Sequence, residues 1–98
     1  MKLRYTERAI GDLEAIHSYI AENNPSAAVA VGSRIRDAIE LLADFPGLGR
    51  PSRIDKFRVL VVAGTPYAVY YTIRKRAREV VIAHIRHTRR RPLRRGEL

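Results

Sequence analysis

The sequence predicts a two-layer α+β fold, in which a helical hairpin packs on one face of a sheet. Three C-terminal strands form an antiparallel meander in that sheet, and an N-terminal strand joins them. Two amphipathic segments, at residues 7–22 and 25–43, carry apolar residues at helical spacing and are separated by one short break. Three runs rich in valine, isoleucine and tyrosine follow at 57–62, 67–73 and 79–85, joined by turn-forming segments. The expected order is β-α-α-β-β-β, in a single domain over residues 1–98.

The first strand and the two helices each have a local signal. Residues 2–6 alternate polar and apolar side chains, which predicts a short strand that joins the sheet of the three later strands. Thr6 can cap the first helix through its hydroxyl, and Asn24 can cap the second. Pro25 suits the first helical position, where its missing N–H is not needed. Because the connection is so short, the helices must be antiparallel and share their apolar stripes.

Matching periodicities predict which side chains form the core. On the 67–73 strand, Tyr70 points away from Tyr67 and Tyr71. It is therefore the better candidate for a surface role, and packing against a neighbouring strand is the equal alternative. The stretch at about 88–98 is basic, without periodicity, and is expected to be a tail. The helical stripe and one face of the strand are expected to bury each other, through Ile10, Leu13, Ile16, Val31, Ile35, Ile39 and Leu42 on the helices and Tyr67, Val69, Tyr71 and Ile73 on the strand.

The net charge of +9 lies entirely in the second half of the chain. Residues 1–56 contain eight basic and eight acidic side chains, whereas residues 57–98 contain eleven basic and two acidic ones. This asymmetry favours a polyanionic target or an acidic protein partner, and a basic surface that only keeps the domain soluble is the alternative. The first residues lack the apolar core of a signal peptide, and no apolar run approaches membrane-spanning length. A cytoplasmic protein that does not bind membranes is expected.

Few residues are candidates for metal, cofactor or catalytic chemistry. The chain has no cysteine, which excludes disulfides, cysteine-ligated zinc and thiol catalysis. His84 and His87 are surrounded by arginines, which repel a cation, so no metal site is expected. The segment 47–49 lacks the lysine and helix of a phosphate-binding loop, and no cofactor is expected. His87, beside Arg86, can act as a general acid or simply hydrogen-bond a sheet edge or a partner.

Basic side chains also border the entry to the 57–62 strand. They form either a solvated loop or contacts to phosphate or to an acidic partner. These residues are Arg50, Arg53, Lys56 and Arg58.

Several short motifs, taken in order, give the chain a resemblance to a known superfamily. They are AIGDLEAI at 9–16, YIA at 19–21, NPSAA at 24–28, FPGLGR at 45–50, PYAVYY at 66–71, HIRH at 84–87 and TRRRP at 88–92. Together they cover residues 2–92 and resemble the RelE/ParE superfamily of toxins from type II toxin–antitoxin modules, also described as plasmid stabilisation proteins.

The resemblance implies one of two activities. RelE-like members cleave messenger RNA in the ribosome without a metal, which would here use Arg58, Tyr70, Arg86 and His87. ParE-like members poison DNA gyrase and are not nucleases. The sequence has Ala68 where the RelE-like pattern places an arginine, and apolar residues at 59–62 where it places basic ones. These departures favour the ParE-like branch.

The resemblance also implies a cognate antitoxin, with which the toxin forms a hetero-oligomer. The charge asymmetry predicts that this partner is acidic and that the association is sensitive to salt. A small basic nucleic-acid-binding module is a third possibility, but no aromatic stacking platform is evident. The residues expected to contact the target or the antitoxin are Arg50, Arg53, Lys56, Arg58, His87, Arg89, Arg90 and Arg91.

Overall fold

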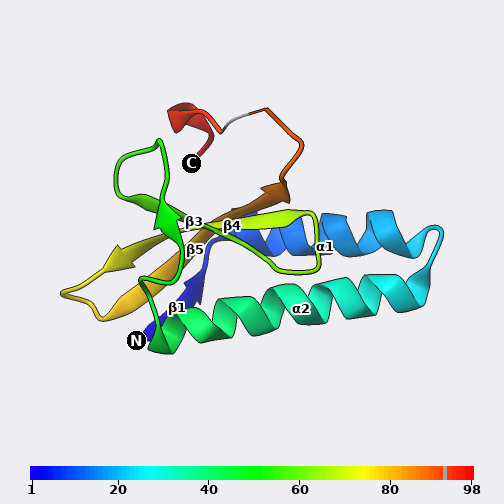
Figure 1. Ribbon diagram of the computed structural model, residues 1–98, viewed down its shortest axis with the longest axis horizontal. Helices are drawn as coiled ribbons and strands as arrows, with labels where there is room; N and C mark the ends of the chain where they lie inside the picture. The colour runs from blue at the N-terminus through cyan, green and yellow to red at the C-terminus, as the bar shows by residue number, and fades with distance from the viewer. Residues whose placement is uncertain (92) are drawn as a thin grey trace.

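Two helices and one sheet form the two layers that the sequence predicts (Figure 1). The computed structural model describes residues 1–91 and 93–98. Their elements are β1 (Lys2–Tyr5), α1 (Glu7–Ala21), α2 (Pro25–Asp44), β2 (Arg50–Pro51), β3 (Phe57–Val61), β4 (Tyr67–Arg74), β5 (Glu79–His87) and a 3₁₀ helix at Arg95–Glu97. None of the helices in this described part is long and apolar enough to cross a membrane.

Both helices begin where the capping residues predict. The Thr6 hydroxyl oxygen accepts a hydrogen bond from the Ala9 N–H at 3.1 Å, and the Asn24 side-chain oxygen accepts one from the Ala27 N–H at 3.1 Å. Pro25 occupies the first turn of α2. The two helices contact each other along their length as an antiparallel pair.

The strands form one mixed sheet in the order β1-β5-β4-β3-β2. The pairs β3–β4 and β4–β5 are antiparallel, which confirms the predicted meander, and β1 joins the sheet parallel to β5. β2 pairs with β3 and has only two residues, too few to show any periodicity in the sequence. β5 extends to His87, so both His84 and His87 lie within a strand.

The core lies between the helices and the sheet, largely as predicted. Of the predicted residues, Ile10 is the exception, with 48% of its surface exposed. Ala9 is fully buried in its place, because it occupies the sheet-facing position of the first turn and Ile10 lies about 100° further round the helix. The predicted residues that are buried are Ile35, Ile39, Leu42, Tyr67, Val69 and Tyr71, with Leu13, Ile16, Val31 and Ile73 packed against them at partial burial.

Residues 93–98, part of the segment where the sequence predicts a basic tail, carry some local structure. Leu93 is buried, and a turn of 3₁₀ helix follows at Arg95–Glu97. Figure 1 shows this end of the chain on the opposite side of the sheet from α2. The fold of this segment depends on an ion pair between Arg91 and Glu97 and on one apolar residue, and neither produces a periodic pattern.

The Tyr71 hydroxyl fixes the segment that connects α2 to β2. It donates a hydrogen bond to the Pro46 carbonyl at 2.7 Å and accepts one from the Gly49 N–H at 2.8 Å. A Cβ atom at position 49 would lie 2.7 Å from the Tyr71 oxygen, so only glycine fits there without a shift.

We expect Tyr71→Phe to lower the free energy of unfolding by roughly 1–3 kcal/mol, because the Gly49 N–H and the Pro46 carbonyl lose a buried partner while the ring volume is kept. Urea denaturation measures the loss. Tyr70→Phe, which removes a hydroxyl from the half-buried neighbour, is the matched control and should change stability much less. Equal effects of the two variants would contradict this account.

Candidate functional site

The strand register decides which face of the sheet each candidate side chain occupies. Directly paired residues of adjacent strands share a face. Tyr67 and His87 are paired, and Tyr67 belongs to the core on the helix side. Ala68 and Arg86 are the next pair and therefore lie on the opposite face, as does Tyr70.

Arg58 lies on the helix side and has a structural partner there. It pairs in register with Tyr71, which is fully buried in the core. Its Nε donates to the Gly49 carbonyl at 2.8 Å, and its Nη2 donates to the Gly47 carbonyl at 3.3 Å. The four residues of the nuclease hypothesis are therefore divided between the two faces, with Arg58 and His87 on one and Tyr70 and Arg86 on the other.

His87 borders a cavity of about 430 Å³ at the edge of β5. Its ring packs edge-on against Tyr67, with the ring centroids 5.4 Å apart, and its Nδ1 accepts a hydrogen bond from the Arg89 N–H at 3.1 Å. Burial, together with nearby Tyr19, raises the pKa of Tyr67. Arg90 also lines the cavity, so the opening combines aromatic and cationic groups.

His84 and Asp12 form a pair that the sequence analysis missed. His84 is 1% exposed, and its Nδ1 lies 2.6 Å from Oδ2 of Asp12 on α1. The same oxygen accepts the Ile85 N–H at 2.9 Å. Because a carboxylate only accepts hydrogen bonds, Nδ1 carries the proton and Nε2 is left to accept from Arg8, whose Nη2 lies 3.4 Å away. The pair fastens α1 to β5, and Asp12 also lines the cavity that His87 borders.

Arg86 is a buried cation whose donors are only partly used. Its side chain is 3% exposed, and its Nη2 donates to the Arg91 carbonyl at 3.0 Å. Nε and Nη1 have no hydrogen-bond partner within the described residues, and a Glu97 carboxylate oxygen stands 3.8 Å from Nη1. Burial, and then Arg90, lower the pKa of Arg86. Arg91 binds the same carboxylate with both Nη atoms, at 2.7 and 3.1 Å.

Arg50 in β2 and Arg53 in the loop that follows lie near Tyr70. All three line a cavity of about 190 Å³, to which Leu93 also contributes. Lys56 is exposed in the turn before β3, with a φ of 71°, and lines a separate cavity of about 380 Å³ with Arg58. The structure thus brings the predicted basic residues together in small groups and not in one site.

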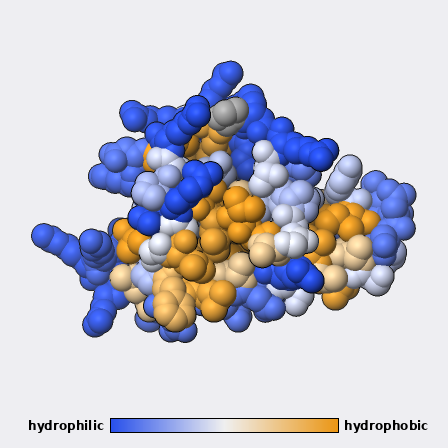
Figure 2. Space-filling model, viewed as in Figure 1, coloured by the Kyte–Doolittle hydropathy of each residue, from blue (hydrophilic) through white to orange (hydrophobic). Residues whose placement is uncertain are grey.

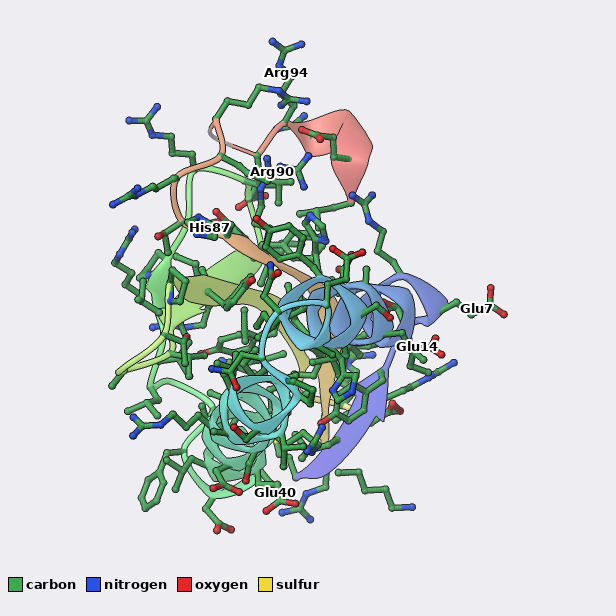
Figure 3. The ribbon with its side chains drawn as sticks, turned by 90° about the vertical axis from the view of Figure 1, so that its right-hand side faces the viewer. Glu7, Glu14, Glu40, His87, Arg90 and Arg94 are labelled. Atoms are coloured by element: carbon green, nitrogen blue, oxygen red, sulfur yellow. The ribbon has the colours of Figure 1, made fainter. Side chains whose placement is uncertain are left out.

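Several basic and acidic side chains lie in different parts of the molecule. Figure 3 shows His87, Arg90 and Arg94 toward one end and Glu7, Glu14 and Glu40 on the helices. Figure 2 shows an apolar area in the middle of the face that it presents, with hydrophilic side chains around it. Within the described residues, no three His, Asp or Glu side chains are placed to hold a metal ion. The basic side chains gathered at one end of the molecule suit contacts with an acidic partner.

Comparison with known proteins identifies a matching family model and two similar curated proteins. Residues 3–92 match the family model described as the ParE toxin of the type II toxin–antitoxin system parDE. A Sinorhizobium fredii protein assigned as toxin Y4kP is 41% identical over 88% of this chain and 86% of its own length. Toxin RelE2 of Caulobacter vibrioides is 35% identical over 88% of this chain and 93% of its own length.

A solved structure agrees with these sequence matches. A chain from the chromosomal ParDE toxin–antitoxin system of P. aeruginosa superposes with a TM-score of 0.79 and is 26% identical. The match covers 89% of this chain and 95% of that one.

Proposed function

The chain belongs to the ParE toxin family of type II toxin–antitoxin systems, and we propose that it acts by inhibiting DNA gyrase and is neutralised by a cognate antitoxin. The observation that supports gyrase over messenger RNA is the placement of the nuclease candidates. Cleavage of a phosphodiester needs several donors directed at one phosphate. Here Arg58 donates to backbone carbonyls, and Tyr70 lies on the sheet face opposite His87. Arg86 borders the same cavity as His87, but its side chain is buried and donates to the Arg91 carbonyl.

The mRNA endonuclease activity of the RelE-like branch is the second candidate. The 35% identity to a protein named RelE2 favours it, over nearly all of that protein's length. Tyr70 and Arg86 share the face opposite the helices, so they are the residues on which such an activity would depend. Arg86 is buried and donates to the Arg91 carbonyl, and the other two candidates, Arg58 and His87, lie on the opposite face, which is why we rank this candidate second.

The antitoxin partner that we propose is acidic, because the second half of the chain carries the entire net charge of +9. The contacts are expected at the basic end of the molecule, around His87 and Arg90 and in the adjoining 89–91 segment. The cations Arg50, Arg53 and Lys56, in β2 and the loop before β3, are exposed and available for the same role. Binding should weaken as the salt concentration rises.

Two purified assays test the proposal side by side. We expect the protein to block supercoiling by DNA gyrase and to leave messenger RNA intact on translating ribosomes. The double variant Arg89→Gln/Arg90→Gln should weaken gyrase inhibition. Arg74→Gln/Arg76→Gln removes the same charge at the opposite end of β5 and should inhibit normally. Codon-phased mRNA cleavage that disappears in His87→Ala, with supercoiling unaffected, would establish the nuclease activity instead.

A further inference from the structure

We propose that Arg86 and Arg91 form a carboxylate-binding site, which the free protein closes with its own Glu97 and which opens to take an acidic segment of a partner protein. The proposal concerns a site and its ligand chemistry, and it does not depend on whether the target is gyrase. Three observations carry it: the geometry around Glu97, the unused donors of Arg86, and the short segment that holds Glu97 in place.

The first observation is that Glu97 is held as a bound carboxylate ligand is held. Both of its oxygens accept from Arg91, at 2.7 and 3.1 Å, in the two-pronged geometry that guanidinium groups use for carboxylates. The Arg94 N–H adds a third hydrogen bond at 2.9 Å. Hydrogen bonds from the Arg91 side chain and the Arg94 backbone lower the pKa of Glu97 to about 2, so this carboxylate is ionised at neutral pH.

The second observation is that Glu97 does not satisfy the whole site. Arg86 is 4% exposed, yet its Nε and Nη1 have no hydrogen-bond partner among the residues that the structure describes. Glu97 comes no closer than 3.8 Å to Nη1, which is beyond hydrogen-bond distance. A carboxylate placed about 1 Å deeper would reach both arginines and gain a charge-assisted bond that Glu97 does not make.

The third observation is that the segment carrying Glu97 has few buried side chains. The segment 93–98 contributes one buried side chain, Leu93, and its other side chains are exposed or half-buried. Outside the segment, Arg8 donates to the Glu97 carbonyl at 2.7 Å from an exposed position. Segments with few buried contacts open at low free energy, so a ligand can compete with Glu97.

The segment 93–98, which closes the site in the free protein, also indicates what kind of ligand fits the site. Leu93 lies four residues before Glu97 and lines a cavity with Val59 and Tyr70 on the same face of the sheet. An acidic residue preceded by an apolar one at similar spacing would occupy both places. A nucleic-acid backbone offers phosphates but no such apolar anchor, so a protein segment is the better match.

The test uses the full chain and an acidic 12-residue peptide that carries leucine and glutamate four positions apart. We expect Glu97→Gln to bind this peptide at least about tenfold more tightly than the wild type, because the internal competitor is weakened. Glu79→Gln is the matched control: it removes the other carboxylate of residues 57–98, which pairs with Arg4 at 3.6 Å, and it should bind as the wild type does. Adding Arg91→Gln to Glu97→Gln should abolish the gain.

Two outcomes of the peptide-binding experiment would overturn the proposed carboxylate site. Equal gains for Glu97→Gln and Glu79→Gln would overturn the proposal, since they would reflect net charge alone. A larger gain for a single-stranded RNA 12-mer than for the peptide would also overturn it and indicate a phosphate site.

Hydrogen exchange on the wild type gives a readout that needs no variant. The Glu97 and Leu98 amides donate to the Arg94 and Arg95 carbonyls, and we expect them to exchange faster when the peptide is bound. Peptide binding that leaves the exchange of these two amides unchanged would show that Glu97 is not displaced. Because neither measurement involves gyrase, a failure of this proposal is distinguishable from a failure of the proposed function.

Discussion

Replacing Ile39 with alanine is expected to lower the free energy of unfolding by about 2–5 kcal/mol, a large share of the roughly 5–15 kcal/mol that stabilises a typical domain. Ile39 is fully buried on the face of α2 that packs against the sheet. Its removal leaves a cavity between two rigid layers, and the surrounding side chains can fill that cavity only in part. Urea denaturation followed by circular dichroism measures the loss.

Ile10→Ala is the matched control for this prediction, because it deletes the same atoms from the other helix. Ile10 is 48% exposed, so the same truncation removes only part of the apolar burial and leaves no enclosed cavity. We expect a loss below about 1 kcal/mol. Similar losses for the two variants would show that α1 buries a different face from the one that the structure assigns.

The contrast between Ile10 and Ala9 also shows what the sequence could not decide. The spacing Ala9, Leu13, Ile16 and Ile20 is as helical as the spacing that begins at Ile10. Hydrophobicity favours isoleucine, but the first turn of α1 lies close to β5, where a small side chain fits. Which of two adjacent residues faces the sheet depends on the distance between layers, and that distance is a tertiary property.

Local signals, by comparison, were reliable. Thr6 and Asn24 accept hydrogen bonds from backbone N–H groups three residues later, and such caps depend on a few neighbouring residues only. Strand alternation likewise placed Tyr70 opposite Tyr67 and Tyr71, as the register confirms. Features set within a few residues can be predicted from the sequence alone.

The candidate site was harder to predict, because a register shift lies within it. Tyr71 pairs with Ile82 and Tyr70 with His84, so Ala83 is skipped between them. Strict alternation from Ile82 would place His84 and Arg86 in the core, whereas Ile85 is the core residue. No sequence pattern predicts this register shift. The shift nevertheless determines which face of the sheet Arg86 and His87 occupy.

Contacts between distant segments were invisible for a different reason. Asp12 and His84 are 72 residues apart, and nothing in the composition of either segment links them. Arg8 and Asp12 lie one helical turn apart, so they share a face of α1. This spacing is the signal in the sequence that could have pointed to the site. That spacing also fits an ordinary surface ion pair, and only the fold brings His84 to the same place.

The Asp12 contact leads to the second large stability prediction. Asp12→Ala leaves the His84 Nδ1–H and the Ile85 N–H without their acceptor, and each unsatisfied group costs roughly 1–3 kcal/mol. Alanine is the better helix former by several tenths of a kcal/mol, which offsets a little of the loss. Glu14→Ala, two residues further along α1 at an exposed position, is the control and should change stability by less than about 0.5 kcal/mol.

Hydrogen exchange separates this explanation from a general loss of stability. If Asp12 fastens α1 to the end of β5, the Ile85 amide should lose protection in Asp12→Ala beyond what the global destabilisation explains, while the Val80 amide should follow the global change. Equal changes at the two amides would contradict a local role. Because the same end of β5 carries His87 and borders the cavity lined by Arg90, loosening α1 there should also weaken the gyrase inhibition that we propose, at temperatures where the variant remains folded. Suppose that the variant is locally loosened yet inhibits gyrase as the wild type does. The target contacts would then lie elsewhere, on the exposed cations Arg50, Arg53 and Lys56.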